Sequence, residues 1–464
     1  MIRSVYGVTS WNADGRPVAD MLFRYLTGRT DRTADMAPLP LFLGILFFSY
    51  TAMIWMQRHV SEHLEWIHMF TCFLLFSCPL MLYCFANRFD VLTKMLSLGA
   101  GFILQMKPVQ TKDRSSERLF LPEDFFWILV STALSVFICC TYQVSLGFAL
   151  SISVLTVFVK YMNENLDKTD IIGELEIFFG IATGAVIYRY FIAPRFLNYE
   201  GWQGNASAVI PLSGNFISAV WHNIKDILRF CLDYFRNFPI IPRWIYGICG
   251  FVLMILFCIK YWQKPAKVIF SLLALIAIFS LSISPLLILA NPGIKARELL
   301  SFTALSLFFG IIILFVYDSN KVILCSCLAL VFLFRFSFMN IWGNAMNAQK
   351  EYEQYLTYMI CRDIEQANAD GRFDSIHFEG DTPRSPEFSS LSWDYPELND
   401  LVPVYINNSD WIGGIQLLRF TELYRIEPSM SEAYKEYPCL FQNSLYSGYG
   451  VDNTIVILFK PAGE

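Results

Sequence analysis

Charged residues are scarce in this chain. They account for 16% of its 464 residues, whereas about 25% is usual for soluble domains. Hydrophobic residues make up 55% of the sequence, and phenylalanine alone occurs 42 times. This composition argues against an ordinary soluble domain and indicates a membrane protein that crosses the bilayer several times.

Residues for several common chemistries are also lacking. Residues 1–37 contain no apolar run typical of a signal peptide. The C-terminal stretch 343–464 has no nucleotide-binding glycine loop, no metal-ligand spacing and no Ser-His-Asp candidate. We interpret its one histidine, His377, as a surface residue of a strand. We therefore predict no cofactor, no metal site and no nucleic-acid partner.

The 12 cysteines do not predict a disulfide framework. Most of them lie in apolar runs, where thiols behave as small hydrophobes. Cys361 and Cys439 lie in the polar C-terminal stretch and could pair in an oxidising compartment.

Apolar runs long enough to cross a bilayer, about 17–25 residues, recur from Pro38 to Trp342. They predict ten spans, near 39–57, 66–87, 91–106, 125–143, 145–161, 171–193, 242–261, 267–290, 299–317 and 320–341. The third is the weakest, because it is short and carries Asp90 and Lys94 at its start. Only Tyr142-Gln143-Val144 separates the fourth span from the fifth, which predicts a tight hairpin or one broken helix.

The positive-inside rule orients these spans. Loops after the odd-numbered spans are the more basic, so we expect them in the cytoplasm. Both termini and the loop 194–241 then lie outside. Five arginines precede the first predicted span, namely Arg3, Arg16, Arg24, Arg29 and Arg32. Such a segment has no obvious way to cross a membrane, so we expect one more helix before Met1, which makes eleven spans with the amino terminus inside.

Two segments outside the spans have the pattern of amphipathic helices. Residues 17–28 place apolar side chains on one helical face and polar ones, including Asp20 and Arg24, mostly on the other. Residues 215–236 place apolar side chains in a stripe along a second helix. Both are expected to lie along the outer membrane surface. The tail begins with a helical stretch, 343–369, and continues with strand-like runs at 373–378, 401–406 and 454–459.

The predicted fold is thus a mainly α polytopic membrane protein with a small C-terminal α+β domain. Residues 1–37 form an outer N-terminal segment, 38–342 the transmembrane domain with its loop 194–241, and 343–464 the outer C-terminal domain. The letters NADGR occur in both outer segments, at 12–16 and 368–372. The second copy follows a helix, where Gly371 suits a left-handed backbone, and the first opens a helix.

Several stretches, taken in order, carry a resemblance to a known family. They are Ile2-Arg3-Ser4, Trp11, Asp14-Gly15-Arg16-Pro17, APLPLFLGILFFSY (37–50), NRFDVLTKMLSLGA (87–100), CTYQVSLGF (140–148) and WGNAMNAQKEYEQY (342–355). The chain resembles the integral-membrane glucosyltransferases of bacteria and phages that modify O-antigen, the serotype-converting type II family. The resemblance runs from end to end.

This resemblance implies transfer of glucose from a polyprenyl-phosphate-glucose donor to a sugar of the O-antigen repeat. The transfer would take place at the periplasmic face of the bacterial inner membrane. Membrane lipids surround the protein, and a glucose-lipid synthase and a flippase would be its functional partners. An acidic residue in the first external loop, just after the first span, would act as general base.

In this sequence that span and its acidic pair would precede Ile2, so we expect a misplaced start or a truncated chain. Asp14 is the nearest acidic residue left in the N-terminal segment, and it is our candidate base. A helix cap in front of Pro17 is the simpler interpretation of the same side chain.

Cations near the outer ends of the spans predict a site for a lipid phosphate. Arg16 suits bidentate phosphate contact, although it could equally reach lipid headgroups. Arg335 lies inside an apolar run, where a charge is costly and usually functional. Trp11 could stack on a sugar, yet an interfacial position explains it as simply. The predicted substrate-binding residues are Arg3, Trp11, Arg16, Lys295, Arg297 and Arg335.

Other functions share this layout. A transporter or flippase of lipid-linked sugars would need repeated halves or broken segments at the bilayer midplane, and we find no repeat. An O-antigen polymerase or acyltransferase remains a second alternative. An acyltransferase would need a histidine or aspartate base within a span, and His59, His63 and His68 lie at the opposite edge from the outer cations.

Overall fold

The computed structural model describes residues 11–28, 36, 38–86, 90–107, 122–198, 202–212, 214–380, 384–404, 406, 425–426 and 432–460. The chain divides into two compact units. One unit is helical and comprises Ser10–Leu26 and Met36–Met339, and most of the described part of the other runs from Asn340 onward. The mainly helical fold with a small C-terminal sheet confirms the predicted class.

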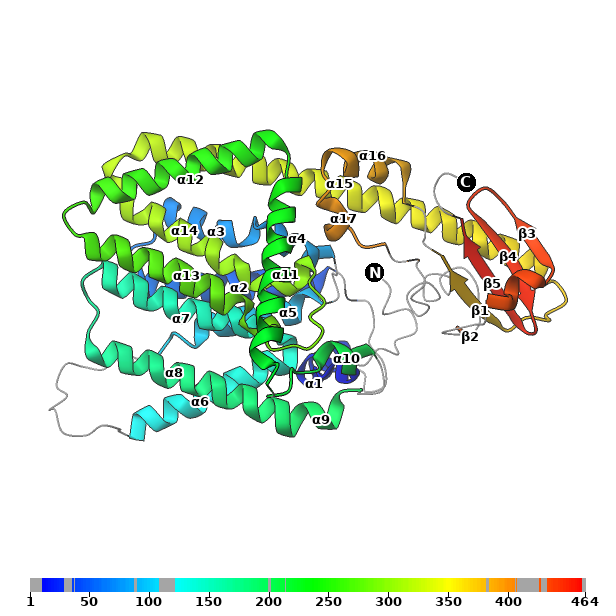
Figure 1. Cartoon of the computed structure of the whole chain (residues 1–464), viewed down its shortest axis with the longest axis horizontal. Helices are drawn as coiled ribbons and strands as arrows, with labels where there is room; N and C mark the ends of the chain where they lie inside the picture. The colour runs from blue at the N-terminus through cyan, green and yellow to red at the C-terminus, as the bar shows by residue number, and fades with distance from the viewer. Residues whose placement is uncertain are drawn as a thin grey trace. The chain divides into compact units, whose positions relative to one another are not determined.

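The helical unit is built from a series of long helices and short connecting turns (Figure 1). Its elements are η1 (Trp11–Asp14), α1 (Pro17–Thr27), α2 (Leu39–His59), α3 (Trp66–Phe76), α4 (Pro79–Ala86), α5 (Val91–Ile103), α6 (Pro122–Tyr142), α7 (Ser145–Met162), α8 (Lys168–Ile187), η2 (Tyr188–Ile192), α9 (Ala193–Phe196), α10 (Trp202–Ser207), α11 (Phe216–Asn237), α12 (Ile240–Lys260), α13 (Pro265–Leu287), η3 (Ala296–Phe302), α14 (Thr303–Val316), η4 (Tyr317–Ser319) and α15 (Lys321–Ala367).

Eight helices in the described part of the chain are long and apolar enough to cross a membrane. They correspond to eight of the ten predicted spans. The predicted span 66–87 is instead a bent pair, because α3 and α4 meet at 63°. Pro79 explains the break, since proline lacks an N–H and restricts the residue before it.

The predicted span 91–106 is the short helix α5. It has 13 residues, and eleven of them are buried. Small residues let the neighbouring helices approach: a Cβ at Gly99 would lie 2.4 Å from the Phe47 ring of α2, and one at Gly101 would lie 3.2 Å from Ala149 of α7. α5 is therefore an internal helix that other helices cover rather than one that faces lipid.

The helix α11 confirms the amphipathic helix predicted at 215–236. It runs crosswise to α12 and α13 in Figure 1, and Asn223 ties it to the end of α13 by donating to the carbonyls of Leu287 (3.1 Å) and Leu289 (2.8 Å). Ile217 and Trp221 on this helix are exposed. An apolar surface of this kind on a crosswise helix suits the boundary between lipid and water.

Small residues also bring α6 and α8 together. Gly180 and Gly184 of α8 lie against Ser131 and Ser135 of α6, and the Ser135 hydroxyl donates to the carbonyl of Ile181 at 2.8 Å. Small residues spaced four apart on both helices allow the backbones to pack closely, as in many membrane helix pairs.

Replacing Gly184 by alanine is expected to lower the thermal unfolding midpoint of the purified chain in detergent. The added methyl would lie 2.6 Å from the Thr132 carbonyl and 2.5 Å from the Ser135 Cβ, and such overpacking costs roughly 1–3 kcal/mol. Gly250→Ala on α12 is the matched control, because a Cβ there meets no atom within 4 Å. Equal losses in the two variants would contradict this packing.

The C-terminal unit combines the end of α15 with a five-stranded sheet in the order β2-β1-β5-β4-β3. Its elements are β1 (Ser375–Glu379), α16 (Pro386–Asp394), α17 (Leu398–Leu401), β2 (Arg425–Ile426), η5 (Glu432–Glu436), β3 (Cys439–Gln442), β4 (Tyr446–Val451) and β5 (Thr454–Phe459). β1 runs parallel to β2 and β5, whereas β4 runs antiparallel to its neighbours β5 and β3. Apolar residues of α15, among them Leu356, Ile360 and Ile364, pack with β1 and β5.

Three predictions for this unit need correction. The run 401–406 is no strand, because α17 ends at Leu401 and the described residues after it are irregular. His377 does lie on a strand, but it is buried beside the carboxylate of Glu379 at 2.9 Å. Cys361 and Cys439 form no disulfide with each other. By contrast Gly371 has φ +68, which confirms the left-handed turn after the helix.

Glu397, which precedes α17, is the most unusual carboxylate of the C-terminal unit. The residue is 1% exposed, and neither carboxylate oxygen has a hydrogen-bond partner among the described residues. Burial raises its pKa from 4.5 to about 7. Between these two values the folded chain keeps a proton that the unfolded chain has released, so the stability of the fold falls as the pH rises through this window.

The protease resistance of the C-terminal unit, measured in the full chain, should therefore fall from pH 4.5 to pH 7. Glu397→Gln should remove part of this dependence and be more resistant than the native chain at pH 8, because glutamine has no charge to bury. Glu387→Gln, at an exposed position of α16, is the control. An identical pH profile for the native chain and Glu397→Gln would count against a buried neutral carboxyl.

Candidate active site

The candidate site is built around the hairpin between α6 and α7, where several segments of the chain come into contact. Tyr142, Gln143 and Val144 form its apex, which confirms the tight hairpin as the correct alternative. The Tyr142 hydroxyl donates to the carbonyl of Arg297 at 2.9 Å, and the carbonyl of Val144 accepts from Ser301 at 2.8 Å. The apex thereby holds η3 by two hydrogen bonds.

The same apex holds the N-terminal segment. Gln143 donates from Nε2 to the Tyr188 hydroxyl (2.7 Å) and to the carbonyl of Asp14 (3.4 Å), and Tyr188 donates to the carbonyl of Gly15 at 2.8 Å. Gly15 has φ +72, and a Cβ there would lie 2.6 Å from the Tyr188 oxygen. Only glycine fits such a place without strain.

Asp20 fastens α1 to the turn before it. The residue was expected on the polar face of this helix, yet it is buried. Its carboxylate accepts from the backbone N–H of Trp11 (3.1 Å) and the amide of Asn12 (3.3 Å), and pairs with Arg24 at 2.6 Å. α1 itself begins at Pro17. Asp14 lies in the preceding turn η1, three residues before the helix begins.

Charged side chains gather around the ring of Tyr142. Arg16 lies over this ring at 4.8 Å and the Lys94 ammonium lies 5.4 Å from its centre. Asp90, just before α5, pairs with Lys94 at 3.0 Å and with Arg16 at 3.8 Å. In η3, Arg297 pairs with Glu298 at 2.9 Å. We call Arg16, Asp90, Lys94, Arg297 and Glu298 the charged cluster.

The electrostatics of the charged cluster favour the charged form of Arg16. Burial lowers the pKa of Arg16, but Asp90, Tyr142, Asp14 and Glu298 together raise it above its ordinary value. Lys94 is 2% exposed and relies on the adjacent carboxylate of Asp90. A buried cation without such a partner would be very costly. The charged cluster can thus present fixed positive charge to an incoming anion.

The sequence-predicted residues fall into three places. Arg16 and Arg297 are members of the charged cluster, and Asp14 contributes to the field at Arg16. Lys295 is exposed, two residues before Arg297. Trp11 is 2% exposed and stacks on Phe23 with ring centres 4.6 Å apart, so contact with a sugar would require this ring to be uncovered.

Arg335 and Arg3 do not join the charged cluster. Arg335 donates from Nη1 to the Leu74 carbonyl and to the Ser77 hydroxyl, both at 3.2 Å, at the break between α3 and α4. Arg3 lies outside the described residues.

Sequence reasoning did not single out Asp90, Lys94, Tyr142 or Glu298 as site residues. A signal was present for the first two, because an acidic and a basic residue four apart opened an otherwise apolar run. In the sequence alone this pair indicates only a weak span. For Glu298 the signal was its position beside Arg297, and for Tyr142 the break between two apolar runs.

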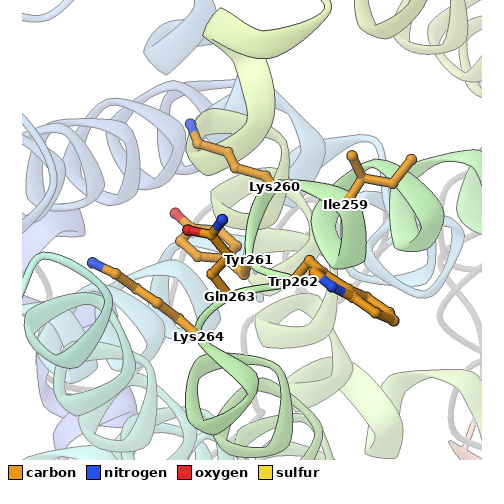
Figure 2. A pocket seen from close by; sticks show the side chains of 6 residues that line it. All are labelled: Ile259, Lys260, Tyr261, Trp262, Gln263 and Lys264. Atoms are coloured by element: carbon orange, nitrogen blue, oxygen red, sulfur yellow. The ribbon is translucent and has the colours of Figure 1, made fainter.

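The other end of α7 and α13 carries a hollow without comparable chemistry. It has a volume of about 590 Å³ and is lined by Ile259, Lys260, Tyr261, Trp262, Gln263 and Lys264 (Figure 2). Its lysines are engaged, since Lys260 donates to the Phe315 carbonyl at 2.6 Å and Lys264 pairs with Glu164. No group of three or more potential metal ligands occurs among the residues that the structure describes.

A helical unit of span-length helices with a buried charged cluster at one end defines a membrane protein with a candidate site for an anionic ligand. The family model for glucosyl transferase GtrII matches residues 1–317. The chain therefore belongs to this glucosyltransferase family, which confirms the resemblance seen in the sequence. The match covers all members of the charged cluster.

One relative extends the likeness to nearly the whole chain. A protein of Salmonella phage P22, described as an uncharacterized 55.3 kDa protein in the gtrB 5′ region, is 24% identical over 480 residues. The match covers 99% of this chain and 92% of the phage protein. No solved structure matches the chain significantly.

The pairing in the charged cluster predicts a specific pattern of stabilities. Asp90→Asn should lower the free energy of unfolding by roughly 3–5 kcal/mol, because it leaves the buried Lys94 without its counter-ion. The double variant Asp90→Asn, Lys94→Met should show a smaller drop in the free energy of unfolding, since it removes both charges. Denaturant unfolding in detergent measures both.

Asp318→Asn is the control for this experiment. Asp318 pairs with Lys321 at 3.3 Å, but the two side chains are 81% and 59% exposed, and such surface pairs contribute roughly 0–1 kcal/mol. A double variant that is less stable than Asp90→Asn alone would contradict the pairing.

Proposed function

We propose that this chain transfers glucose from polyprenyl-phosphate-glucose to a sugar of the O-antigen repeat. The reaction is assigned to the outer, periplasmic face of the bacterial inner membrane. Membership of the glucosyltransferase family supports the reaction class. The observation that carries the site is the charged cluster, in which three cations meet two carboxylates around one tyrosine ring.

The chemistry of this transfer suits such a cluster. The acceptor hydroxyl loses its proton to a carboxylate while its oxygen attacks the anomeric carbon of glucose. The bond from that carbon to the phosphate oxygen breaks, and polyprenyl phosphate leaves. Its phosphate changes from a monoanion to a dianion, so preorganised cations stabilise the transition state more than the bound donor.

Within the charged cluster we assign the phosphate to Arg16 and Arg297, whereas Lys94, which is 2% exposed, pairs with Asp90. Guanidinium groups suit phosphate oxygens because they donate in a planar fork. Asp90 pairs with both Arg16 and Lys94, so we do not assign it as the general base. Lys295 and Arg3 remain proposed contacts to the donor or to headgroups, and Trp11 remains a proposed contact to the sugar.

Two carboxylates remain as candidates for the general base. Asp14 is the residue proposed from the sequence, and its carbonyl is held by Gln143 at the hairpin apex. Glu298 is added by the structure, because it lies in η3 next to Arg297 and contributes to the field at Arg16. An acceptor that enters beside the donor phosphate could reach either.

The proposed location follows from the order of the helices. The positive-inside rule assigns the end with α1, α11 and η3 to the periplasm. The amphipathic helices α1 and α11 would then lie along the outer leaflet, and the C-terminal unit, which follows α15, would be periplasmic. A glucose-lipid synthase and a flippase would supply the donor on this side.

Analysis of lipopolysaccharide structure tests the proposal. A host with an unmodified O-antigen that expresses this chain, together with the synthase and flippase, should gain one glucose on each modified repeat. An unchanged O-antigen, with the protein present in the inner membrane, would refute the function.

A flippase is the second candidate, because the broken span α3–α4 is a feature of transporters. The purified protein in detergent micelles separates the two. A transferase should glucosylate an O-antigen acceptor from polyprenyl-phosphate-glucose there, whereas a flippase has no sealed membrane across which to act and should yield no product.

The same assay identifies the base. Either Asp14→Asn or Glu298→Gln should lower kcat by roughly 10²–10⁴-fold, as expected when a general base is lost, with little change in the unfolding midpoint. Glu62→Gln, at an exposed position between α2 and α3, should keep full turnover. If Asp14→Asn and Glu298→Gln both remained fully active, the base would have to lie elsewhere.

A further inference from the structure

The break between α3 and α4 is held by a side chain from a distant helix. α3 ends at Phe76, and Pro79 begins α4. The last carbonyls of a helix have no N–H of the same helix to bind, and Leu74 carries one of them. Its oxygen accepts from Arg335 Nη1 at 3.2 Å and from the Ser77 hydroxyl at 3.4 Å.

Arg335 also binds Ser77 itself, at 3.2 Å from Nη1 to the hydroxyl oxygen. One turn earlier on α15, the ring of Phe332 packs against Phe70 (5.2 Å) and Phe73 (5.3 Å) of α3. α15 is thus docked on α3 by aromatic contacts, and its arginine reaches the place where α3 stops. A cation within an apolar helix is costly, and freed backbone groups of a broken span need such donors.

The helix beyond the break leads to the candidate active site. α4 contacts η3, and its residues Met81, Leu82 and Cys84 are buried. Tyr83 of α4 is close enough to Arg297 to act on it electrostatically. The direction in which α4 leaves the break therefore decides where Arg297 and Glu298 lie relative to Arg16 and Lys94.

We propose that Arg335 is a positioning residue that fixes the bend of the α3–α4 span and, through α4, the place of η3 in the charged cluster. It acts on the backbone of the protein and does not bind the donor phosphate. Its effect on turnover rests on the proposed glucosyl transfer, whereas its contact with the break does not.

A double-mutant cycle tests the contact between Arg335 and the break through stability alone, without an activity measurement. Arg335→Met keeps the length of the side chain and removes its donors, and Ser77→Ala removes one acceptor. Each variant should lower the thermal unfolding midpoint. The drop in the double variant should be clearly smaller than the sum of the two single drops, because both variants break the same hydrogen bond. Ser284→Ala should be additive with Arg335→Met, since the Ser284 hydroxyl binds Leu281 on α13. Additive losses for Arg335 and Ser77 would overturn the proposal.

Kinetic measurements in detergent test the effect of Arg335 on turnover. Arg335→Met should lower kcat by about tenfold or more with a donor KM within about twofold of the native value, because transition-state placement suffers and phosphate binding does not. Ser77→Ala should move kcat in the same direction, and Arg335→Lys should recover part of the loss. Arg243→Met on α12, whose guanidinium binds the Arg236 carbonyl, should change neither constant.

The opposite pattern identifies direct phosphate binding. A donor KM that rises tenfold or more in Arg335→Met, with Ser77→Ala unchanged, would overturn the positioning role. If the native chain transfers no glucose at all, the proposed function fails, and the stability cycle still decides whether Arg335 holds the break.

Discussion

The arrangement of the helical unit depends on the hairpin apex between α6 and α7, formed by Tyr142, Gln143 and Val144. A turn this short brings the ends of two long helices together, and its side chains bind three other segments. Tyr142 binds the backbone of η3, whereas Gln143 binds the turn before α1 and the hydroxyl of Tyr188. Because the bonds to η3 and to the turn before α1 go to backbone carbonyls, these two segments are held whatever their own side chains do. Those side chains are left to form the charged cluster.

Charge balance is the second constraint. Lys94 is almost fully buried and stays so because Asp90 precedes it by one helical turn. Arg16 comes from a different segment and shares both Asp90 and the ring of Tyr142. Cations fixed in this way need no reorganisation when an anion arrives, which suits the proposed reaction with its phosphate leaving group. The same fixed charges would serve poorly in a site that must bind and release neutral sugars alone.

Irregular helices lie where other protein segments cover them. α5 has only 13 residues and is enclosed by α2, α6 and α7. The bend between α3 and α4 is covered by α15, which supplies Phe332 and Arg335. Backbone groups freed at membrane depth are tolerated only in such surroundings. Both irregular segments lead toward the charged cluster, so the interruption of regular spans and the candidate active site share one location.

The sequence by itself determined the class of fold, eight span-length helices, both amphipathic helices and the membership of a glucosyltransferase family. These depend on apolar length, helical period and local motifs, which are properties of neighbouring residues. Only the tertiary structure decided that 91–106 is an internal helix, that His377 and Glu397 are buried, and that Asp90, Tyr142 and Glu298 join Arg16. The partner of a buried charge is chosen by packing between segments far apart in the chain. Arg335 shows the difference: its sequence context marked it as important, and its contacts placed it at the bend of α3–α4.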